Sequence, residues 1–187
     1  EADAGSDPGA MTTRATRDGA GWVLEGQKRW VTNGARAGLV VVVARTDDDQ
    51  GTGAFLVDPA GGGYAAHGRE STMGLRASET LSVTFDGTPA ELLGAEGKGL
   101  SYALSALDTG RVGIAAQAVG IAGAAMEHAT RYALEREQFG RALADFGAIQ
   151  VKLAEMLRRI LGARALAHDA GQALQAMGNG GHPRTGA

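Results

Sequence analysis

The chain has 187 residues, enough for one large domain or two small ones with a proper core. Its 18 basic and 21 acidic residues leave a formal net charge of −3, which gives no reason to expect nucleic acid or an anionic membrane as partner. The absence of cysteine excludes disulfides and thiolate chemistry. The four histidines lack metal-ligand spacing and no run is long enough to cross a bilayer, so we expect neither a metal site nor a membrane span.

Residues 10–92 have a dominant hydrophobic period of two, which predicts an antiparallel β domain over residues 1–97. The strand candidates are 21–25 and 27–32 around a tight turn at Gly26, then 39–45, 53–58 and the alternating run Leu81, Val83 and Phe85. Residues 39–45 are almost uniformly apolar, which predicts a strand buried on both faces. Residues 47–50 and 59–63 have loop compositions.

Within this half, residues 28–34 read KRWVTNG. Strand alternation places Trp30 and Thr32 on one face, with Arg29 and Val31 on the other. Taken alone, the stretch is explained by a core tryptophan, a β-forming threonine and an Asn-Gly turn. A large indole and a hydroxyl on one face also suit a ligand site.

Beyond Gly97 the hydrophobic period becomes helical, and two seams predict two long helices within residues 98–178, joined by a linker around residues 140–147. The first seam comprises Leu100, Leu104, Leu107, Arg111, Ile114, Ala118, Ile121, Ala125, His128 and Tyr132. The second comprises Ile149, Leu153, Met156, Ile160, Ala163, Ala167, Ala170, Leu174 and Met177. An antiparallel helical hairpin cannot bury both seams alone, so further helices are implied, in a bundle. Residues 179–187 are rich in helix breakers and predict a disordered tail.

Two charged residues interrupt the first seam. Arg111 stands where the stripe requires a hydrophobic residue, and Asp108 lies three residues earlier on the same side. A charge on a core-facing stripe must be paired or must meet a ligand. The two interpretations are therefore an interhelical salt bridge and a polar ligand channel along this face.

Five motifs in order resemble those of the acyl-CoA dehydrogenase family of flavoenzymes, and together they cover nearly the whole chain. They are EADAGSD at 1–7, KRWVTNG at 28–34, MGLRAS at 73–78, LDTGR at 107–111 and YALEREQFG at 132–140. The resemblance implies an α+β fold, in which residues 1–97 are the family's middle β domain. Residues 98–178 would then be the first part of its C-terminal helical domain.

The resemblance implies FAD as cofactor and assigns two groups of residues to it. Trp30, Val31 and Thr32 would border the flavin, where a flat aromatic excludes water and a small hydroxyl orients the ring. A second group would reach the pyrophosphate and adenosine of FAD bound by a neighbouring subunit, because guanidinium forks suit pyrophosphate. It comprises Arg136, Gln138 and Phe139. From the residues alone, REQFG is adequately explained as a polar helix end closed by Gly140.

The same resemblance implies that Ser6, Asp108 and Arg111 contact the acyl-CoA substrate. Family chemistry is an α,β-desaturation, in which a carboxylate removes the α-proton while the β-hydrogen leaves as hydride. The catalytic glutamate lies either at the position of Gly110 or in a later C-terminal segment. Gly110 has no side chain, so we predict that the base lies outside this sequence and that the chain is a fragment. Gly147 stands where the family commonly has glutamine.

The leading functional hypothesis is therefore an FAD-dependent acyl-CoA dehydrogenase, homotetrameric, that passes electrons to an electron-transfer flavoprotein. One alternative is a non-catalytic subunit that completes the FAD site of a paralogue in a heteromer, which Gly110 would permit. Another is a flavin monooxygenase or oxidase of the same fold. The expected location is the cytoplasm, or the mitochondrial matrix in a eukaryote, and the acyl chain length is not encoded in these residues.

Overall fold

The computed structural model describes residues 1–46 and 51–181, with side chains to residue 177. The chain divides into two compact units, Glu1–Ser105 and Ala106–Ala187, which we take in turn. The predicted loop at 47–50 and residues 182–187 of the predicted tail lie outside the described residues, whereas residues 179–181 continue a helix.

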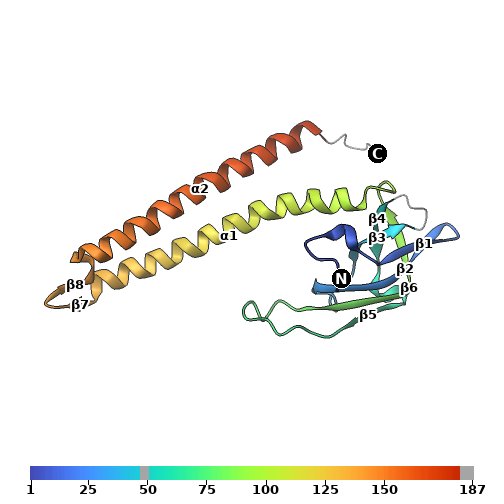
Figure 1. Cartoon of the computed structure of the whole chain (residues 1–187), viewed down its shortest axis with the longest axis horizontal. Coiled ribbons are helices and arrows are strands. Elements are labelled where there is room, and N and C mark those ends of the chain that lie inside the picture. Colours follow the sequence, from blue (N-terminus) through green and yellow to red (C-terminus); the bar gives the residue numbers. More distant parts are fainter. Residues whose placement is uncertain (47–50, 182–187) are drawn as a thin grey trace. The chain divides into compact units, whose positions relative to one another are not determined.

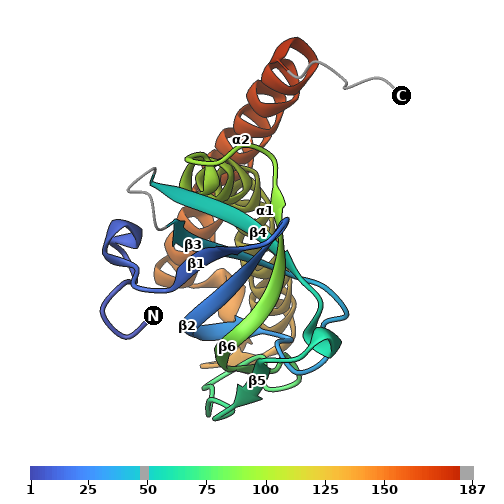
Figure 2. The ribbon, with the colours of Figure 1, turned by 90° about the vertical axis from the view of Figure 1, so that its right-hand side faces the viewer.

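Six strands of the first unit form one sheet (Figure 1). They are β1 (Arg14–Asp18), β2 (Gly21–Thr32), β3 (Val40–Thr46), β4 (Thr52–Val57), β5 (Tyr64–His67) and β6 (Thr80–Leu93). Their order is β2-β1-β3-β4-β6-β5, and β2 also pairs with β6. Five strands therefore close into a ring, the barrel of this unit (Figure 2). All pairings are antiparallel except the short parallel one between β1 and β3. The sheet is accompanied by two short 3₁₀ helices, η1 (Pro8–Ala10) and η2 (Pro59–Gly61).

The predicted turn at Gly26 is wrong, because β2 runs through it as one strand. Gly26 has φ 132° and lies where the register between β2 and β6 shifts. A Cβ atom at this position would lie 2.8 Å from the Cα of Thr13. The glycine therefore forms a bulge that lets the Thr13 backbone approach β2 closely.

The prediction that residues 39–45 are buried on both faces is also wrong. In β3 the side chains alternate, with Val42 and Ala44 buried, while Val41 is 58% exposed. A strand in a closed antiparallel ring has one face toward the core and one outward, so apolar composition alone does not show two-sided burial.

The core of the first unit is one cluster of buried side chains inside the ring. Its members are Ala15, Trp22, Leu24, Val42, Ala44, Phe55, Val57, Leu81, Val83 and Phe85. The rings of Trp22 and Phe55 pack with centroids 5.2 Å apart at a tilt of 60°. Burying such aromatic and aliphatic side chains is the main source of stability in a unit of this size.

The first unit extends to Ser105, beyond the predicted boundary at residue 97, because the start of α1 (Gly99–Glu135) is attached to β4. The N–H of Leu100 donates to the Thr52 hydroxyl at 2.9 Å. A Cβ at Gly99 would lie 2.3 Å from the carbonyl carbon of Gly53, so only glycine permits this contact.

The second unit contains the remainder of α1 together with the helix α2 (Gly147–Gly181). The two helices run antiparallel. A Cβ at Gly171 would contact Val112, and one at Gly123 would contact Arg164, which places the two helices in opposite directions. The connection holds β7 (Glu137–Gln138), β8 (Arg141–Ala142) and η3 (Leu143–Asp145). The predicted linker at 140–147 is thus partly ordered structure.

The predicted seam of α1 is displaced by one residue from the face that meets α2. Predicted members such as Ile114 and Ile121 are 65% and 67% exposed. Most residues of this unit's part of α1 that are at least partly buried are small and lie one position later along the helix: Val112, Ala115, Val119, Ala122, Met126, Ala129 and Ala133. Gly123 and Thr130 are also partly buried. On α2 the predicted seam agrees better, since Ile160 is buried and Leu153 and Met156 are half-buried. Because α1 is apolar on two neighbouring faces, periodicity could not decide which one α2 covers.

Candidate functional site

Trp30 lies at a bulge near the end of β2. Lys28 pairs with Val83 and Val31 pairs with Leu81, so Arg29 and Trp30 both stand opposite Ser82. Trp30 has φ 61° and its side chain is 61% exposed. A bulky residue in the left-handed region is a genuine outlier, and such strain is concentrated at functional sites. The local prediction of a core tryptophan is therefore wrong, and the indole is available to a ligand.

The two residues after Trp30 take opposite orientations. Val31 is half-buried against the core cluster, whereas Thr32 is exposed. The Val31 side chain is thus less accessible to a ligand than those of its neighbours Trp30 and Thr32. The strand then ends at the predicted turn, where Asn33 has φ 56° and its N–H donates to the Glu79 carbonyl at 2.9 Å. The Tyr64 hydroxyl donates to the Gly34 carbonyl at 2.7 Å and fixes the turn, and burial raises the pKa of Tyr64.

Ser6 lies in the same unit, in an exposed segment just before η1. Asp7 is the N-cap of η1, because its carboxylate accepts from the Gly9 N–H at 3.0 Å. The Arg45 guanidinium holds the same segment by donating to the carbonyls of Met11 and Gly9, at 2.8 and 2.6 Å.

Glu1, the first residue of the EADAGSD motif, closes this segment, a role that the sequence analysis did not predict. Its side chain is only 7% exposed and pairs with Lys28 at 2.5 Å. Burial raises the pKa of the Glu1 carboxyl, but hydrogen bonds from Lys28, Thr12 and Thr13 outweigh this and hold the pKa well below its ordinary value. These partners are 11 to 27 residues away, so no local spacing indicates them.

In the second unit, Asp108 and Arg111 form an ion pair at 3.4 Å on the surface of α1. The pair is within one helix, so the interpretation as an interhelical salt bridge is wrong. The side chains are 62% and 73% exposed, and such a pair contributes little stability. Gly110 lies between them, and a Cβ there would meet no heavy atom within 4 Å.

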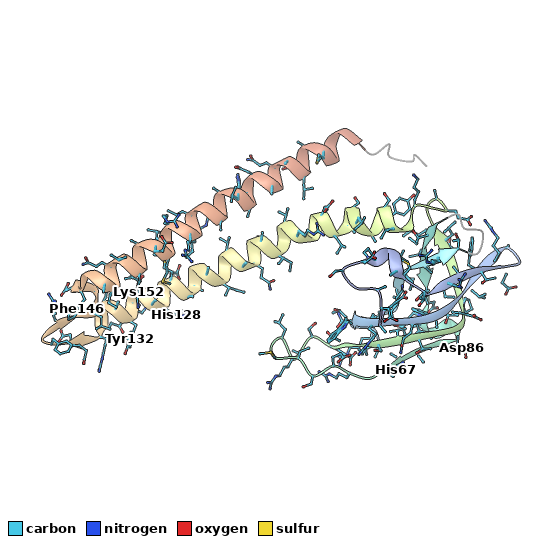
Figure 3. All side chains as sticks on the ribbon, in the orientation of Figure 1. His67, Asp86, His128, Tyr132, Phe146 and Lys152 are labelled. Atoms are coloured by element: carbon cyan, nitrogen blue, oxygen red, sulfur yellow. The ribbon has the colours of Figure 1, made fainter. Side chains whose placement is uncertain are left out.

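The segment REQFG forms a tight hairpin rather than a simple helix end. Gln138 pairs with Arg141 across a two-residue turn in which Phe139 and Gly140 have φ 55° and 78°. Two positive φ values are typical of a type I′ turn, which matches the twist of the two strands. Phe139 at the turn is 94% exposed, and Arg136 precedes the hairpin on the exposed surface. Tyr132 and Phe146 lie at this end of the helix pair (Figure 3).

The predicted residues of the second unit lie at two separate positions. Arg111 and Glu135, the residue before Arg136, are separated by about 36 Å along α1, since an α-helix rises about 1.5 Å per residue. The Asp108–Arg111 pair and the REQFG hairpin of one chain are therefore too far apart to contact the same small group.

Metal clusters and membrane-spanning helices are both absent from the described residues. No group of three or more His, Asp or Glu side chains in it could hold a metal ion. His67, His128 and His168 are all exposed, as expected of surface histidines, and His182 lies outside the described residues. No described helix has the length and apolarity needed to cross a membrane.

Comparison with known proteins identifies two family models. Residues 1–88 match the acyl-CoA dehydrogenase middle domain, and residues 97–185 match the acyl-CoA dehydrogenase C-terminal domain. A curated relative, the mitochondrial short-chain specific acyl-CoA dehydrogenase of Bos taurus, is 45% identical over 168 residues. That alignment covers 87% of this chain and 41% of the relative.

Two solved structures resemble the fold closely. Butyryl-CoA dehydrogenase from Megasphaera elsdenii has a TM-score of 0.86 at 38% identity, over 90% of this chain and 46% of that one. A glutaryl-CoA dehydrogenase from Mycobacterium smegmatis in complex with FADH2 has a TM-score of 0.82 at 38% identity, over 89% and 43%. The chain thus spans less than half the length of these relatives.

Proposed function

This chain belongs to the acyl-CoA dehydrogenase family, and on that premise we propose that it forms part of an FAD-dependent enzyme that desaturates acyl-CoA thioesters. The observation that carries the proposal is Trp30, whose indole is exposed from a strained backbone at the end of β2. The first unit gains no core packing from such a residue, so its arrangement is explained by a ligand with a flat apolar face.

The residues of the first unit fit a flavin. Trp30 presents an apolar face that excludes water, and the exposed hydroxyl of Thr32, two residues along the same strand, can donate a hydrogen bond beside it. When bound, the flavin would accept the β-hydrogen of the substrate as hydride while a carboxylate takes the α-proton, leaving the α,β-unsaturated thioester. Ser6, Asp108 and Arg111 would hold the substrate.

The proposed reaction requires a carboxylate as catalytic base, and none of the residues named above supplies it. Gly110 has no side chain, so we assign proton removal to a glutamate outside residues 1–187. The open space around Gly110 is compatible with a substrate passing close to the helix backbone.

The REQFG hairpin suits the FAD of a neighbouring subunit. Arg136 offers a planar set of donors to a pyrophosphate, and Phe139 is an exposed apolar surface beside it. The hairpin is about 36 Å from the Asp108–Arg111 position along α1, which favours contact with the FAD of a second active site. We therefore propose a homo-oligomer, a tetramer in its simplest form, with an electron-transfer flavoprotein as electron acceptor.

The helical unit is proposed as part of a larger bundle. Large apolar side chains on both helices are exposed within the described residues, among them Ile114, Ile121 and Leu166. A single helical hairpin cannot bury two apolar faces of α1, so additional helices would stabilise this unit.

The experiment is an anaerobic titration of the complete FAD-loaded protein with butyryl-CoA and with longer and branched acyl-CoA thioesters. We expect loss of the oxidised flavin absorbance with at least one thioester, and re-oxidation by an electron-transfer flavoprotein. A complete protein that binds FAD but is reduced by none of them would contradict the proposal. Oxygen consumption coupled to hydroxylation would instead indicate a monooxygenase.

Gly110 favours one second candidate, a subunit without a base that completes the FAD site of a paralogue. Stable co-purification with a glutamate-bearing paralogue would support it. A self-sufficient, active homo-oligomer would exclude it.

A further inference from the structure

The Glu1 carboxylate accepts five hydrogen bonds. One oxygen accepts from the backbone N–H and the hydroxyl of Thr12, the latter at 2.9 Å. The other accepts from the hydroxyl of Thr13 at 2.7 Å, from its N–H at 3.3 Å and from the Lys28 ammonium at 2.5 Å. A carboxylate offers about four lone-pair sites, so its accepting capacity is filled by protein donors.

These bonds join the two ends of a loop, residues 1–13. Thr12 and Thr13 follow Glu1 by eleven and twelve residues, so the carboxylate closes the segment on itself. The closing point is part of the barrel, because the Arg45 N–H donates to the Thr13 carbonyl at 2.9 Å and Lys28 belongs to β2. Thr13 is fully buried against the bulge at Gly26.

Ser6 lies between two attachment points of this loop. On its C-terminal side the segment is held by the Asp7 cap and by the Arg45 guanidinium. On its N-terminal side, among the described residues, the Glu1 side chain holds the segment through its hydrogen bonds with Thr12, Thr13 and Lys28. Loss of the Glu1 contacts would therefore release one side of the Ser6 segment while the other stays attached.

We propose that Glu1 is a positioning residue for substrate binding, whose buried carboxylate closes the 1–13 loop and so holds Ser6 where the CoA part of the thioester binds. This inference rests on the proposed function, in which Ser6 contacts CoA. Glu1 itself touches only protein groups, so its effect falls on the affinity for CoA and not on the chemical step.

The test compares Glu1→Gln, Ser6→Ala and the double variant in the complete FAD-loaded protein, by calorimetric titration with free CoA. Glutamine keeps the shape of the side chain but turns an amide NH₂ toward groups that are themselves donors. We expect Glu1→Gln to raise the Kd about tenfold, which corresponds to about 1.4 kcal/mol. We expect the double variant to bind no more weakly than the weaker single variant, because both changes disable one contact. An unchanged Kd in Glu1→Gln, or fully additive losses, would overturn the proposal.

A matched control is Glu96→Gln, which removes another carboxylate of the first unit, one that pairs with Arg17 at 2.7 Å and not with a residue of the 1–13 loop. It should leave the Kd for CoA unchanged, and hydrogen exchange of residues 2–11 should rise in Glu1→Gln alone.

If Glu1→Gln does not fold, Thr12→Val removes one of the five bonds, and we expect a two- to threefold rise in Kd. Equal Kd values for Thr12→Val and wild type would then overturn the proposal. Absence of CoA binding by the wild-type protein would refute the proposed function itself, a result distinct from intact wild-type binding with an unaffected Glu1 variant.

Discussion

The two units of the chain bury their apolar residues to very different extents. The barrel encloses a cluster of ten buried hydrophobic residues, whereas the buried hydrophobic residues described on the helical unit are Ala133 and Ile160. The barrel closes on itself by pairing β2 with β6 and so encloses its core, while β5 stays at the edge of the sheet. The helices meet along a stripe of mainly small residues. The comparison teaches that the first unit contains its own source of stability, whereas the second leaves large apolar side chains exposed, as we propose for part of a larger bundle.

The largest expected effect contrasts a core position with an exposed helix position. In the 187-residue chain, Phe55→Ala should lower the free energy of unfolding of the barrel by about 3–5 kcal/mol, because it leaves a cavity beside Trp22. Leu166→Ala, at a side chain 72% exposed, should cost less than about 0.5 kcal/mol. Urea unfolding followed by circular dichroism measures both. Equal costs in this chain would contradict the comparison, and a larger Leu166→Ala cost in the complete protein would support additional helices.

The next effect concerns a buried charge. Glu1→Gln should lower the free energy of unfolding by about 3 kcal/mol at pH 7, because it leaves Lys28 without its partner in a largely buried position. The folded-state pKa of Glu1 is depressed, so its stabilisation is present above its ordinary pKa of 4.5 and is lost as the pH falls below that value. Wild type and variant should therefore converge in acid unfolding curves.

The control for that measurement comes from the other unit. Glu155 on α2 has its pKa lowered to about 2 by hydrogen bonds from Arg158 and Arg159, but it lies at the surface. Glu155→Gln should produce a smaller loss than Glu1→Gln at pH 7, since exposed pairs are screened by solvent. A larger loss would mean that burial does not distinguish the two carboxylates.

Substituting alanine for two glycines of α1 should change the free energy of unfolding in opposite directions. Gly99→Ala should destabilise the barrel by about 1–3 kcal/mol, because the new Cβ would overlap the Gly53 backbone. Gly110→Ala should stabilise the helix by about 1 kcal/mol, because nothing lies near its Cβ and alanine favours the helix. Thermal unfolding of each variant gives the sign. Destabilisation by both would show that Gly110 is also packed.

The smallest effect on stability is expected at the surface ion pair. Asp108→Asn should change the free energy of unfolding by less than about 0.5 kcal/mol, because both partners are mostly exposed. In the complete protein, the same change should raise the KM for butyryl-CoA several-fold if the pair holds substrate. A stability loss without a change in KM would assign the pair a structural role.

The sequence was sufficient for the division into a β half and a helical half, because hydrophobic periods of two and of about 3.6 report the local burial directly. It did not distinguish a bulge at Gly26 from a turn, since both use glycine and the difference lies in Thr13, which is distant in the chain. The face of α1 that meets α2 lies one residue later than the predicted seam, because small residues contribute weakly to an apolar pattern but permit close helix packing.

The candidate site was predictable to a similar degree. The motifs singled out Trp30, Thr32 and the REQFG segment, whose ligand contacts stay predictions. The predicted alternation, with Arg29 and Val31 on one face, breaks at the bulge, because Arg29 is exposed whereas Val31 is half-buried. The positive φ of Trp30 and the I′ turn at Phe139 were not predictable, because non-glycine residues rarely adopt these conformations and no local pattern indicates them. Glu1 was missed because its partners are set by tertiary structure.

The backbone of Trp30 has a consequence for how this position can vary. Left-handed geometry costs a non-glycine residue about 1–2 kcal/mol, so phenylalanine or alanine would bear the same strain and only glycine would remove it. A library of variants selected for abundance should therefore enrich glycine at position 30, while one selected for turnover should retain an aromatic residue. The disagreement between the two selections would measure how much stability evolution has given up at this position for activity.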